Sequence, residues 1–302
     1  MAPPHRPRIT ILGSLNIDLV SYVPHHPLPG ETLTSTHFDT SPGGKGANQA
    51  VACAKLSRAS DLSSPSADVA MLGAVGADQY GTTLLDSLAE YGVDTSGVAV
   101  RKAAKTGIAI IVVDEPSGQN RIILSPESNH TLLPSHFEEL PAPKPDLLIM
   151  QLEVPFDTVM QALTAAKAEG IPVLLNPAPA QALPASAYDG LAHLIVNETE
   201  ASILSGRPES ELEDEAGLDG VANIFLERRS GNKGLVPALK ANVVDTTAAG
   251  DTFVGSYALS IVNAGEGEFD IDAAVKAANR ASAITVSRKG AQISIPWKDE
   301  LQ

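Results

Sequence analysis

Short apolar runs alternate with longer amphipathic segments along most of this chain. The runs RITILGSLNIDLV, VAMLGAVG, DLLIM and IPVLL predict buried strands, because a strand that is covered on both faces needs no polar side. Apolar residues recur at helical spacing in QYGTTLLDSLAEYGV and PFDTVMQALTAAKAEG, and Gly92 and Gly170 are suited to end these helices. The alternation predicts an α/β fold with a mostly parallel central sheet between helices.

A second group of strands is predicted outside that sheet. Residues 31–40 are rich in Thr and roughly alternating, which favours an exposed strand. Residues 106–129 contain two β-rich runs around a Pro-Ser-Gly turn, which is typical of a hairpin. We expect these segments to form a small sheet of their own. One domain over residues 1–302 with such an appendage fits the length of the chain.

The pattern breaks in the last third of the chain. Residues 217–230 predict a helix, and the α/β rhythm then requires a strand, yet Pro237 interrupts the only apolar run that follows. Two Ala-rich helices are predicted beyond this point, over residues 251–264 and 271–286.

Charge and cysteine content exclude several classes of protein. The formal net charge is −15, so the surface repels nucleic-acid phosphates and anionic lipid, and we expect binding to neither. The chain has no run of 18 apolar residues and no signal peptide that we can recognise, so no membrane span is expected. Cys53 is the only cysteine, which excludes an intramolecular disulfide and favours an intracellular protein. The Ser-rich residues 57–68 predict a mobile surface insertion.

The stretch SPGGKGANQA is the first candidate for a binding site. Gly43 and Gly44 allow the backbone to approach a ligand closely, and Lys45 and Asn48 are polar groups that could face it. An ordinary turn into a helix explains the same residues about equally well. The spacing is not that of a P-loop, and no G-x-G-x-x-G follows the first strand, which disfavours a nicotinamide enzyme.

A second candidate lies where DTTAAGDTF becomes a helix. Ala248, Ala249 and Gly250 carry little side chain, so they leave the N–H groups at the helix N-terminus open to an anion. Asp251 follows within one turn. A hydroxyl that attacks a phosphoryl group needs such a base next to donors that take up the spreading charge. The alternative is a carboxylate that the helix dipole alone favours, by about 0.3–1 kcal/mol.

Polar residues at the ends of predicted strands form a third group. Asn16 and Asp18 are predicted in a loop after the first apolar strand, and Glu153 ends another apolar run. Ligands of open parallel sheets bind at the carboxyl ends of the strands. Carboxylates and amides there suit sugar hydroxyls, whereas Asn197 and Glu200 could serve phosphates or hydrated Mg²⁺. Taken singly, each residue is better explained as a helix cap or a solvated loop residue.

Several of these motifs, in this order, resemble the ribokinase-like (pfkB) carbohydrate kinases. GGKGANQAVACAKL and DTTAAGDTFVGSYAL are similar to the two signatures of that family, and LGSLNIDLV, PGET, MQLE, LNPAPA, NETEA and SRKGAQISIPW extend the likeness over nearly the whole chain. The resemblance implies a three-layer ribokinase-like fold with a small β-sheet lid, formed by about residues 22–42 and 106–125, that also makes a homodimer contact. It implies ATP-dependent phosphorylation of D-ribose at the 5-hydroxyl, with Mg²⁺ and with K⁺ as a monovalent activator. It further implies a cytoplasmic protein, with the nucleus as a second location.

The resemblance also assigns roles to individual residues. The sugar would be held by Asn16, Asp18, Gly44, Lys45, Gly46, Ala47, Asn48, Glu153 and Asp251. Asp251 would be the base, and Ala248, Ala249 and Gly250 would form the anion hole. Asn197 and Gly250 would contact the nucleotide phosphates, Asn279 would lie beside the adenine, and Glu200 would belong to the Mg²⁺ and phosphate network. Potassium would be surrounded by Asp245, Thr247, Thr285, Arg288, Gly290 and Ser294.

One departure from the family pattern lies near Arg229–Gly234. The family carries a strand and a nucleotide-contacting turn at this point, and roughly twenty residues are missing here, about one strand with its loops. Two alternatives therefore stay open: an impaired form that binds sugar but holds ATP poorly, and a related kinase for fructose or a nucleoside.

Overall fold

A six-stranded parallel sheet forms the centre of the computed structural model, which describes residues 6–212, 214–227, 236–264 and 269–301. Every pair of neighbouring strands in this sheet is parallel. From one edge to the other, the strands are β10 (His193–Leu194), β9 (Val173–Leu175), β8 (Leu147–Met150), β1 (Arg8–Leu12), β4 (Asp68–Gly76) and β5 (Asp94–Arg101). The predicted α/β class with a mostly parallel sheet is confirmed.

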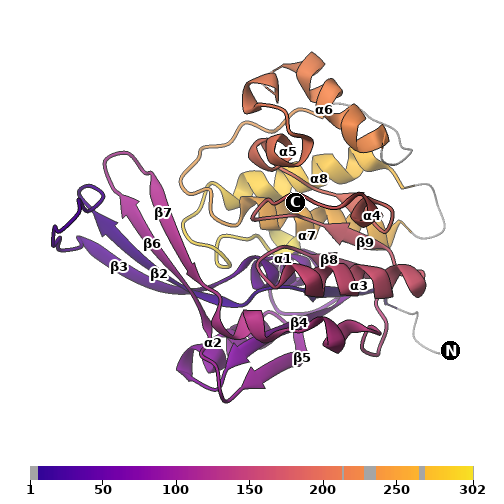
Figure 1. The fold of residues 1–302 in the computed structure, drawn as a ribbon, viewed down its shortest axis with the longest axis horizontal. Helices are drawn as coiled ribbons and strands as arrows, with labels where there is room; N and C mark the ends of the chain where they lie inside the picture. The colour runs from indigo at the N-terminus through magenta and orange to yellow at the C-terminus, as the bar shows by residue number, and fades with distance from the viewer. Residues whose placement is uncertain (1–5, 213, 228–235, 265–268, 302) are drawn as a thin grey trace.

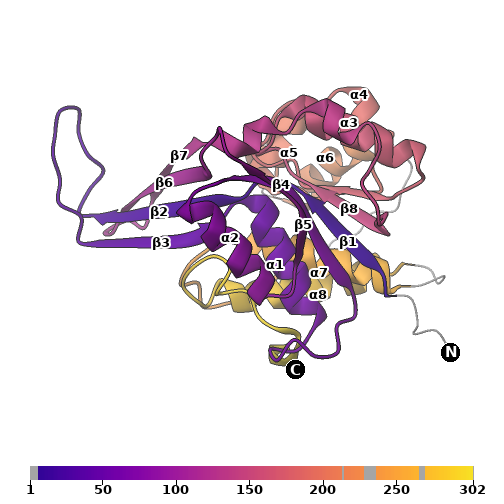
Figure 2. The same ribbon diagram turned by 90° about the horizontal axis from the view of Figure 1, so that it is seen from below.

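Helices cover both faces of this sheet (Figures 1 and 2). The helices are α1 (Lys45–Ser57), α2 (Gln79–Glu90), α3 (Phe156–Ala168), α4 (Ala185–Tyr188), α5 (Glu198–Ser205), α6 (Glu215–Glu227), α7 (Ala249–Asn263) and α8 (Ile271–Thr285). Short 3₁₀ turns lie at Glu127–Thr131, Pro134–Phe137, Glu209–Leu212 and Lys298–Glu300. Gly92 and Gly170 follow α2 and α3 with φ of 77° and 69°, as expected for left-handed residues that end a helix.

Successive residues of the central strands point into two different cores. Leu147 and Ile149 of β8 belong to the core shared with α1, α7 and α8, whereas Leu148 and Met150 belong to the core shared with α3. All four side chains are fully buried. The strands therefore read as continuous apolar runs because both faces are covered, which makes the three-layer arrangement.

The small sheet projects from one end of the molecule (Figure 1). Its strand order is β3 (His37–Gly43), β2 (Asn16–Val23), β6 (Gly107–Asp114) and β7 (Asn120–Ser125). The predicted hairpin is present as the antiparallel pair β6–β7. The predicted strand over 31–40 begins only at His37, because residues 31–36 form a loop before pairing with β2 starts.

Three details of the sequence prediction were wrong. Residues 8–20 form two strands in two different sheets, so Asn16 and Asp18 lie on β2 and not in a loop. Strand β5 was not predicted, because Asp94, Ser96 and Gly97 break its apolar pattern. The Ser-rich segment 57–68 is partly built into the body, since Arg58 is buried and donates to the carbonyl of Gly92 at 2.9 Å.

The prediction of a missing strand can be compared with the structure only after residue 235, where the described residues resume. The predicted seam at 228–234 lies outside the described residues. Residues 236–248, which are described, contain no strand, and β10 with its two residues stands at the edge of the central sheet. None of the helices in the described parts of the chain combines the length and the apolar character needed to cross a membrane.

Close packing of α1 on α7 brings the two motif helices together. A Cβ at Gly255 would lie 2.5 Å from Cβ of Ala52, so only glycine permits this approach. Cys53 is fully buried in the same contact, and burial raises the pKa of its thiol to about 12. The contact sets the N-terminal turns of α1 and α7 against each other.

Candidate active site

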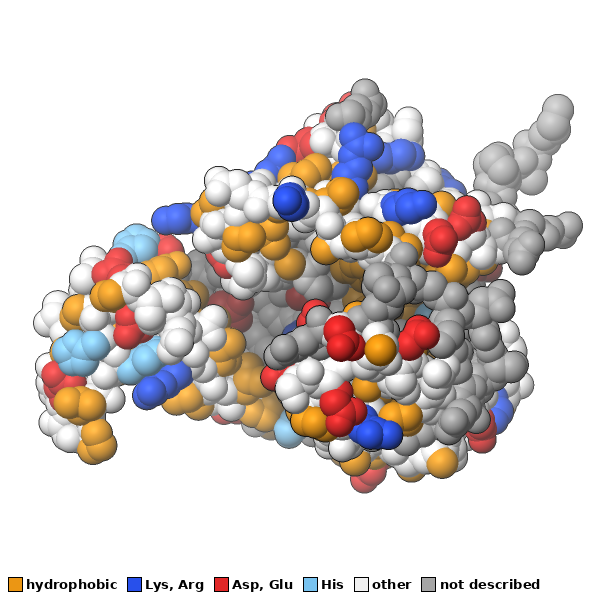
Figure 3. Space-filling view, turned by 90° about the horizontal axis from the view of Figure 1, so that it is seen from above, with side chains coloured by type: hydrophobic (Ala, Val, Ile, Leu, Met, Phe, Trp, Pro, Cys, Tyr) orange, Lys and Arg blue, Asp and Glu red, His pale blue; other side chains and the backbone are white. Residues whose placement is uncertain are grey.

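A cleft of about 450 Å³ opens where α1, α5, α7 and α8 meet above the central sheet. Figure 3 shows the molecule hollowed between the small sheet and the rest of the protein. The cleft is lined by Lys45, Asn176, Ile195, Val196, Asn197, Glu200, Thr246, Ala248, Ala249, Gly250, Asp251, Phe253 and Ser282. Of the predicted residues, the lining thus brings together Lys45, Asn197, Glu200, Ala248, Ala249, Gly250 and Asp251. Asn16, Asp18, Asn48 and Glu153 are not part of this lining.

The N-terminal turn of α7 forms one wall of this cleft. Ala248 is the N-cap residue and has a left-handed backbone with φ of 60°, which is uncommon for a residue with a side chain. A Cβ at Gly250 would meet no heavy atom within 4 Å, so the glycine keeps this side of the turn open. The first N–H groups of a helix have no intrahelical partner, so this turn can receive an anion. Ala249 differs in part from this prediction of open N–H groups, because its N–H already donates to Thr246 O at 3.3 Å.

Asp251 lies one residue deeper in α7 and is buried, with 7% of its surface exposed. Asn48 Nδ2 donates to its Oδ2 at 3.1 Å, and Gln49 Nε2 donates to its Oδ1 at 3.0 Å. Donors to both oxygens stabilise an ionised carboxylate. A carboxylate held beside an open helix N-terminus is the arrangement that proton removal next to a phosphoryl group requires.

The turn of SPGGKGANQA brings the backbone of three segments together. Gly44 is the N-cap of α1 with φ of 88°, and a Cβ there would lie 2.8 Å from Asn16 N. A Cβ at Gly46 would lie 2.6 Å from the backbone of Gly13 and Ser14. Ala47 is fully buried, and its N–H donates to Ser14 O at 2.9 Å. Gly46 and Ala47 therefore shape the site through their backbone packing.

Acidic side chains gather on the side of the cleft toward the small sheet. Burial of Asp18, with further contributions from Glu153 and Asp251, raises the pKa of its carboxyl from 3.8 to about 7. Glu153 accepts from Ser14 Oγ at 2.5 Å and from Lys45 N at 3.1 Å. Asn16 accepts from Asn129 Nδ2 at 2.8 Å. These carboxylates and amides form a polar wall suited to hydroxyl groups.

Lys45 supplies the positive charge of the cleft. Burial by itself lowers the pKa of its ammonium, but the carboxylates of Asp251, Glu153 and Glu200 outweigh that effect and raise it overall. Lys45 therefore stays charged at neutral pH and can face an anionic group.

Asn197 and Glu200 form the opposite wall at the start of α5. Asn197 Oδ1 accepts from Glu200 N at 2.8 Å, and Glu200 Oε2 accepts from Asn197 N at 3.0 Å, which is a capping box. The alternative explanation of these residues as helix caps is therefore true as well. Among the described residues, the hydrogen bonds to the Glu200 carboxylate end on Oε2, which leaves Oε1 for a hydrated cation.

The residues predicted around potassium gather next to the start of α7. Asp245 accepts from Thr247 N and Oγ1 at 2.9 and 2.6 Å and from Gly290 N at 2.9 Å. The other side chains of this set are hydrogen-bonded elsewhere. Thr285 Oγ1 is bonded to Thr252 Oγ1, Arg288 donates to Glu300, and Ser294 Oγ donates to Ala291 O. The Asp245 carboxylate, the hydroxyl oxygens and the backbone carbonyls of these segments could serve a monovalent cation, whereas the Arg288 guanidinium has no acceptor atom.

Asn279 lies apart from the cleft lining. It is half-buried on α8, and its Nδ2 donates to Pro237 O at 3.3 Å. Its predicted place beside the adenine is untested by this geometry.

Four buried amides were missed by the sequence reasoning. Gln49, Gln151, Asn176 and Gln292 connect the base to the rest of the site. Asn176 follows β9 directly, so the rule that ligands bind at strand ends could have found it. Gln292 lies in SRKGAQISIPW, one of the segments that carry the family likeness, but no local pattern shows that this side chain packs behind the site.

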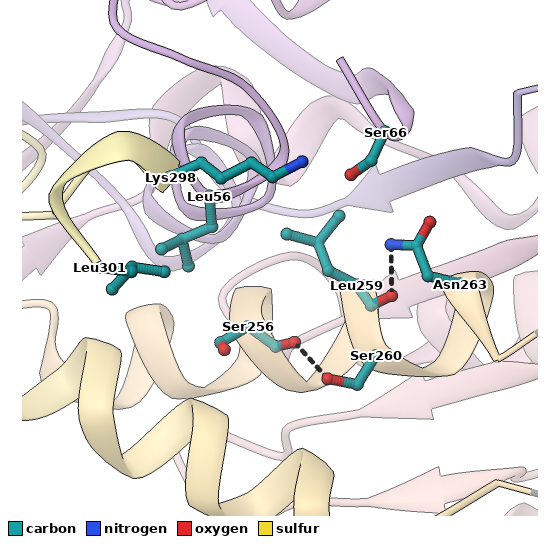
Figure 4. A pocket seen from close by; sticks show the side chains of 8 residues that line it. All are labelled: Leu56, Ser66, Ser256, Leu259, Ser260, Asn263, Lys298 and Leu301. Atoms are coloured by element: carbon teal, nitrogen blue, oxygen red, sulfur yellow. Dashed lines mark hydrogen bonds between the residues drawn. The ribbon is translucent and has the colours of Figure 1, made fainter. Parts of the chain in front are cut away.

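A second hollow of about 320 Å³ lies on another side of α7 (Figure 4). Its polar side chains are used within their own helix, since Ser260 Oγ donates to Ser256 O at 3.2 Å and Asn263 Nδ2 to Leu259 O at 2.8 Å. Lys298 is the single charged residue of its lining. This hollow has no carboxylate that could act as a base.

Comparison with known proteins gives a consistent result. The profile of the pfkB family carbohydrate kinases matches residues 6–298. A ribokinase of Schizosaccharomyces pombe is 39% identical over 95% of this chain and 94% of its own, and a ribokinase of Haemophilus influenzae is 36% identical over 98% and 97%. The crystal structure of Arabidopsis thaliana ribokinase complexed with ribose and ATP has a TM-score of 0.82, with 26% identity and 98% of both chains covered.

The alignments contain more positions than this chain fills. The Haemophilus alignment has 314 positions, whereas 98% of 302 residues is about 296, so about 18 positions have no residue in this chain. For the yeast protein, 311 positions cover 95%, or about 287 residues, which leaves about 24.

Proposed function

The chain belongs to the pfkB family of carbohydrate kinases, and we propose that it phosphorylates D-ribose at its 5-hydroxyl with ATP as the phosphoryl donor. The observation that carries this proposal is the position of Asp251, a buried carboxylate at the open N-terminus of α7. Ribose is the proposed substrate because the Schizosaccharomyces pombe and Haemophilus influenzae relatives, which match over nearly the whole chain, are ribokinases.

The reaction follows from the two motif helices. The 5-hydroxyl lies against Asp251, which takes its proton as the oxygen attacks the γ-phosphorus in line with the leaving ADP. The N–H groups at the start of α7 take up charge that spreads over the transferred oxygens. Asn16, Asp18, Asn48 and Glu153 hold the other hydroxyls, so the 5-hydroxyl alone reaches the base.

Charge on the nucleotide requires positive partners beyond Lys45. Asn197 and Gly250 would contact the phosphates, and Glu200 would help to hold hydrated Mg²⁺, which would neutralise phosphate charge. K⁺ beside Asp245 would steady the loop whose N–H groups face the phosphate. Asn279 belongs to the adenine end of the cleft.

The small sheet is proposed to be both a lid and a homodimer contact. Apolar side chains on it stand in solvent, with Phe38 53%, Ile122 54% and Ile123 62% exposed. An exposed apolar sheet of this kind fits a partner of the same shape. For the location in the cell, we propose the cytoplasm, with the nucleus as a second compartment.

Two other functions are less well supported. A form that binds sugar but holds ATP poorly is not favoured, because the cleft walls at α5 and α7 are both in place. A kinase for fructose or a nucleoside is not favoured, because the compared relatives are ribokinases.

Release of ADP in a coupled assay tests the proposal. With ATP, Mg²⁺ and K⁺, we expect turnover that depends on ribose, and ³¹P NMR should show a phosphomonoester on the 5-oxygen. A panel of ribose, 2-deoxyribose, fructose and inosine separates the substrate classes. Absence of ribose-dependent turnover rejects the proposal, and preference for another compound of the panel replaces ribose.

A further inference from the structure

Both oxygens of the Asp251 carboxylate are held by the amides of two successive residues of α1. Asn48 Nδ2 lies 3.1 Å from Oδ2, and Gln49 Nε2 lies 3.0 Å from Oδ1. Successive residues of a helix point about 100° apart, so the two amides reach the carboxylate from different sides. They fix the plane of the carboxylate as well as its position.

The direction of each inner amide matters, because oxygen and nitrogen occupy nearly the same volume in an amide group. A reversed amide would place its oxygen against the carboxylate. Gln292 Nε2 donates to Asn48 Oδ1 at 3.2 Å, and Gln151 Nε2 donates to Gln49 Oε1 at 2.6 Å. Each outer amide thus occupies the oxygen of an inner amide and leaves its NH₂ facing Asp251.

The outer ends of this amide relay (Asn48, Gln49, Gln151, Asn176 and Gln292) are anchored in turn. Ser87 Oγ donates to Gln292 Oε1 at 3.3 Å, which directs the NH₂ of Gln292 inward. Asn176 Nδ2 donates to Ile195 O at 3.0 Å, so Asn176 Oδ1 is free to accept from Gln49. All members are buried, with at most 8% exposed.

The amide of Gln151 donates to Gln49 through Nε2 although its own Oε1 is left without a hydrogen bond from the described residues. Its Oε1 is buried and has no hydrogen-bond partner among the described residues. A Cβ at Gly13 would lie 2.0 Å from that oxygen, so the neighbouring backbone leaves room for the amide and little else. An unpaired buried acceptor is unfavourable, so a glutamine kept here for packing alone would be disfavoured against an apolar residue.

We propose that Gln151 and Gln292 are positioning residues: through Gln49 and Asn48 they keep two donors aimed at Asp251 and hold it as an ionised, oriented base. The inference rests on the proposed function, because it assigns Asp251 the role of base. Both outer glutamines are buried and donate to the inner amides, so we expect them to act through Asn48 and Gln49.

The variants Gln292→Met and Gln151→Met test this, since each keeps an unbranched side chain and removes one donor. We expect kcat for ribose phosphorylation to fall on the order of tenfold in each, with KM for ribose changed less than about twofold. Gln161→Met on α3 is the matched control, because Gln161 is part-buried on a helix far from the base, and it should leave kcat unchanged.

The pKa of the Asp251 carboxyl gives a readout that does not depend on turnover. Titration by ¹³C NMR, assigned by comparison with Asp251→Asn, should show a higher pKa in both Met variants, because an ionised form with fewer aimed donors is less stable. Asp18, Glu153, Glu200 and Lys45 face the same cleft and are present in every variant, so their effect cancels in the comparison.

If a Met variant does not fold, Ser87→Ala removes the hydroxyl that orients Gln292 and should shift kcat and the pKa in the same direction by a smaller amount. Unchanged kcat together with an unchanged Asp251 pKa overturns the inference. A change in KM for ribose as large as the fall in kcat also overturns it. A wild-type protein without ribose-dependent turnover rejects the proposed function instead, and the titration then decides alone on the amide relay.

Discussion

The backbone N–H of Gly290 donates to Oδ2 of Asp245 at 2.9 Å, and this hydrogen bond joins segments 45 residues apart. It ties the loop in front of α7 to the turn that follows α8. The other oxygen of Asp245 accepts from Thr247 N and Oγ1. One carboxylate therefore holds the backbone that leads into the N-terminal turn of α7.

Asp245→Asn should reduce both turnover and its activation by K⁺. The amide keeps one acceptor oxygen but loses the charge that a cation needs and one of the two acceptor positions. We expect kcat to fall on the order of 10–10²-fold, with a flat response to K⁺. Rates measured against K⁺ at constant ionic strength check this, with the exposed Asp272→Asn on α8 as a control. An unchanged K⁺ response in Asp245→Asn would contradict the role of Asp245.

Asp251→Asn should separate catalysis from sugar binding. The substitution removes the base, so kcat should fall on the order of 10²–10⁴-fold, while the Kd for ribose changes little. Steady-state rates and calorimetry give the two quantities. A loss of ribose affinity larger than the loss of rate would show that Asp251 mainly binds the sugar.

Asp18 should make stability depend on pH in a known direction. Its folded pKa of about 7 lies above the usual 3.8, so the folded protein binds this proton more tightly than the unfolded chain does. The stabilisation that protonated Asp18 gives to the folded protein is fully present below pH 4 and is lost as pH rises through 7. Relative to Asp18→Asn, the wild-type free energy of unfolding should fall over this range by at most about 4 kcal/mol.

Urea unfolding of both proteins at several pH values measures that difference. Ribose affinity should move in the opposite sense and strengthen up to about pH 7, since the ionised carboxylate is the better acceptor for sugar hydroxyls. A stability difference that is constant from pH 4 to pH 7 would show that Asp18 titrates normally.

Two glycines of the motif helices should respond differently to a side chain. Gly250→Val places its side chain in open space, so Tm should change little while ATP-dependent turnover is lost, because the side chain blocks the anion position. Gly46→Ala forces a Cβ to 2.6 Å from backbone atoms, which should cost about 1–3 kcal/mol of stability. Thermal unfolding and activity of the two variants distinguish these outcomes, and a strongly lowered Tm in Gly250→Val would be unexpected.

The sequence predicts the body of this fold well because its signals are local. Continuous apolar runs predicted β4 and β8, which are covered on both faces. Amphipathic spacing with a terminal glycine predicted α2 and α3. The split of residues 8–20 could not be predicted, because the run stays apolar while the chain passes from one sheet to the other. Strand β5 was hidden since polar residues at one edge of a sheet look like a loop.

The candidate site was predicted through residues that motifs carry, Asp251 and Lys45 among them. The second layer behind them escaped, because Gln151 and Gln292 act over long separations along the chain. Gln292 reaches Asn48 across 244 residues, and no local pattern encodes such a contact. Longer-range hydrogen bonds of this kind follow from tertiary packing alone.

The single cysteine of the chain has a practical consequence for fluorescent labelling of the small sheet. Cys53 is fully enclosed between α1 and α7, and its elevated pKa keeps the thiol protonated, so maleimide reagents should leave the native protein unlabelled. A thiol introduced at exposed Leu28 and a second on α3 would accept a dye pair without any background substitution. Energy transfer between the two dyes would then report whether the distance between the small sheet and α3 changes when ribose is added.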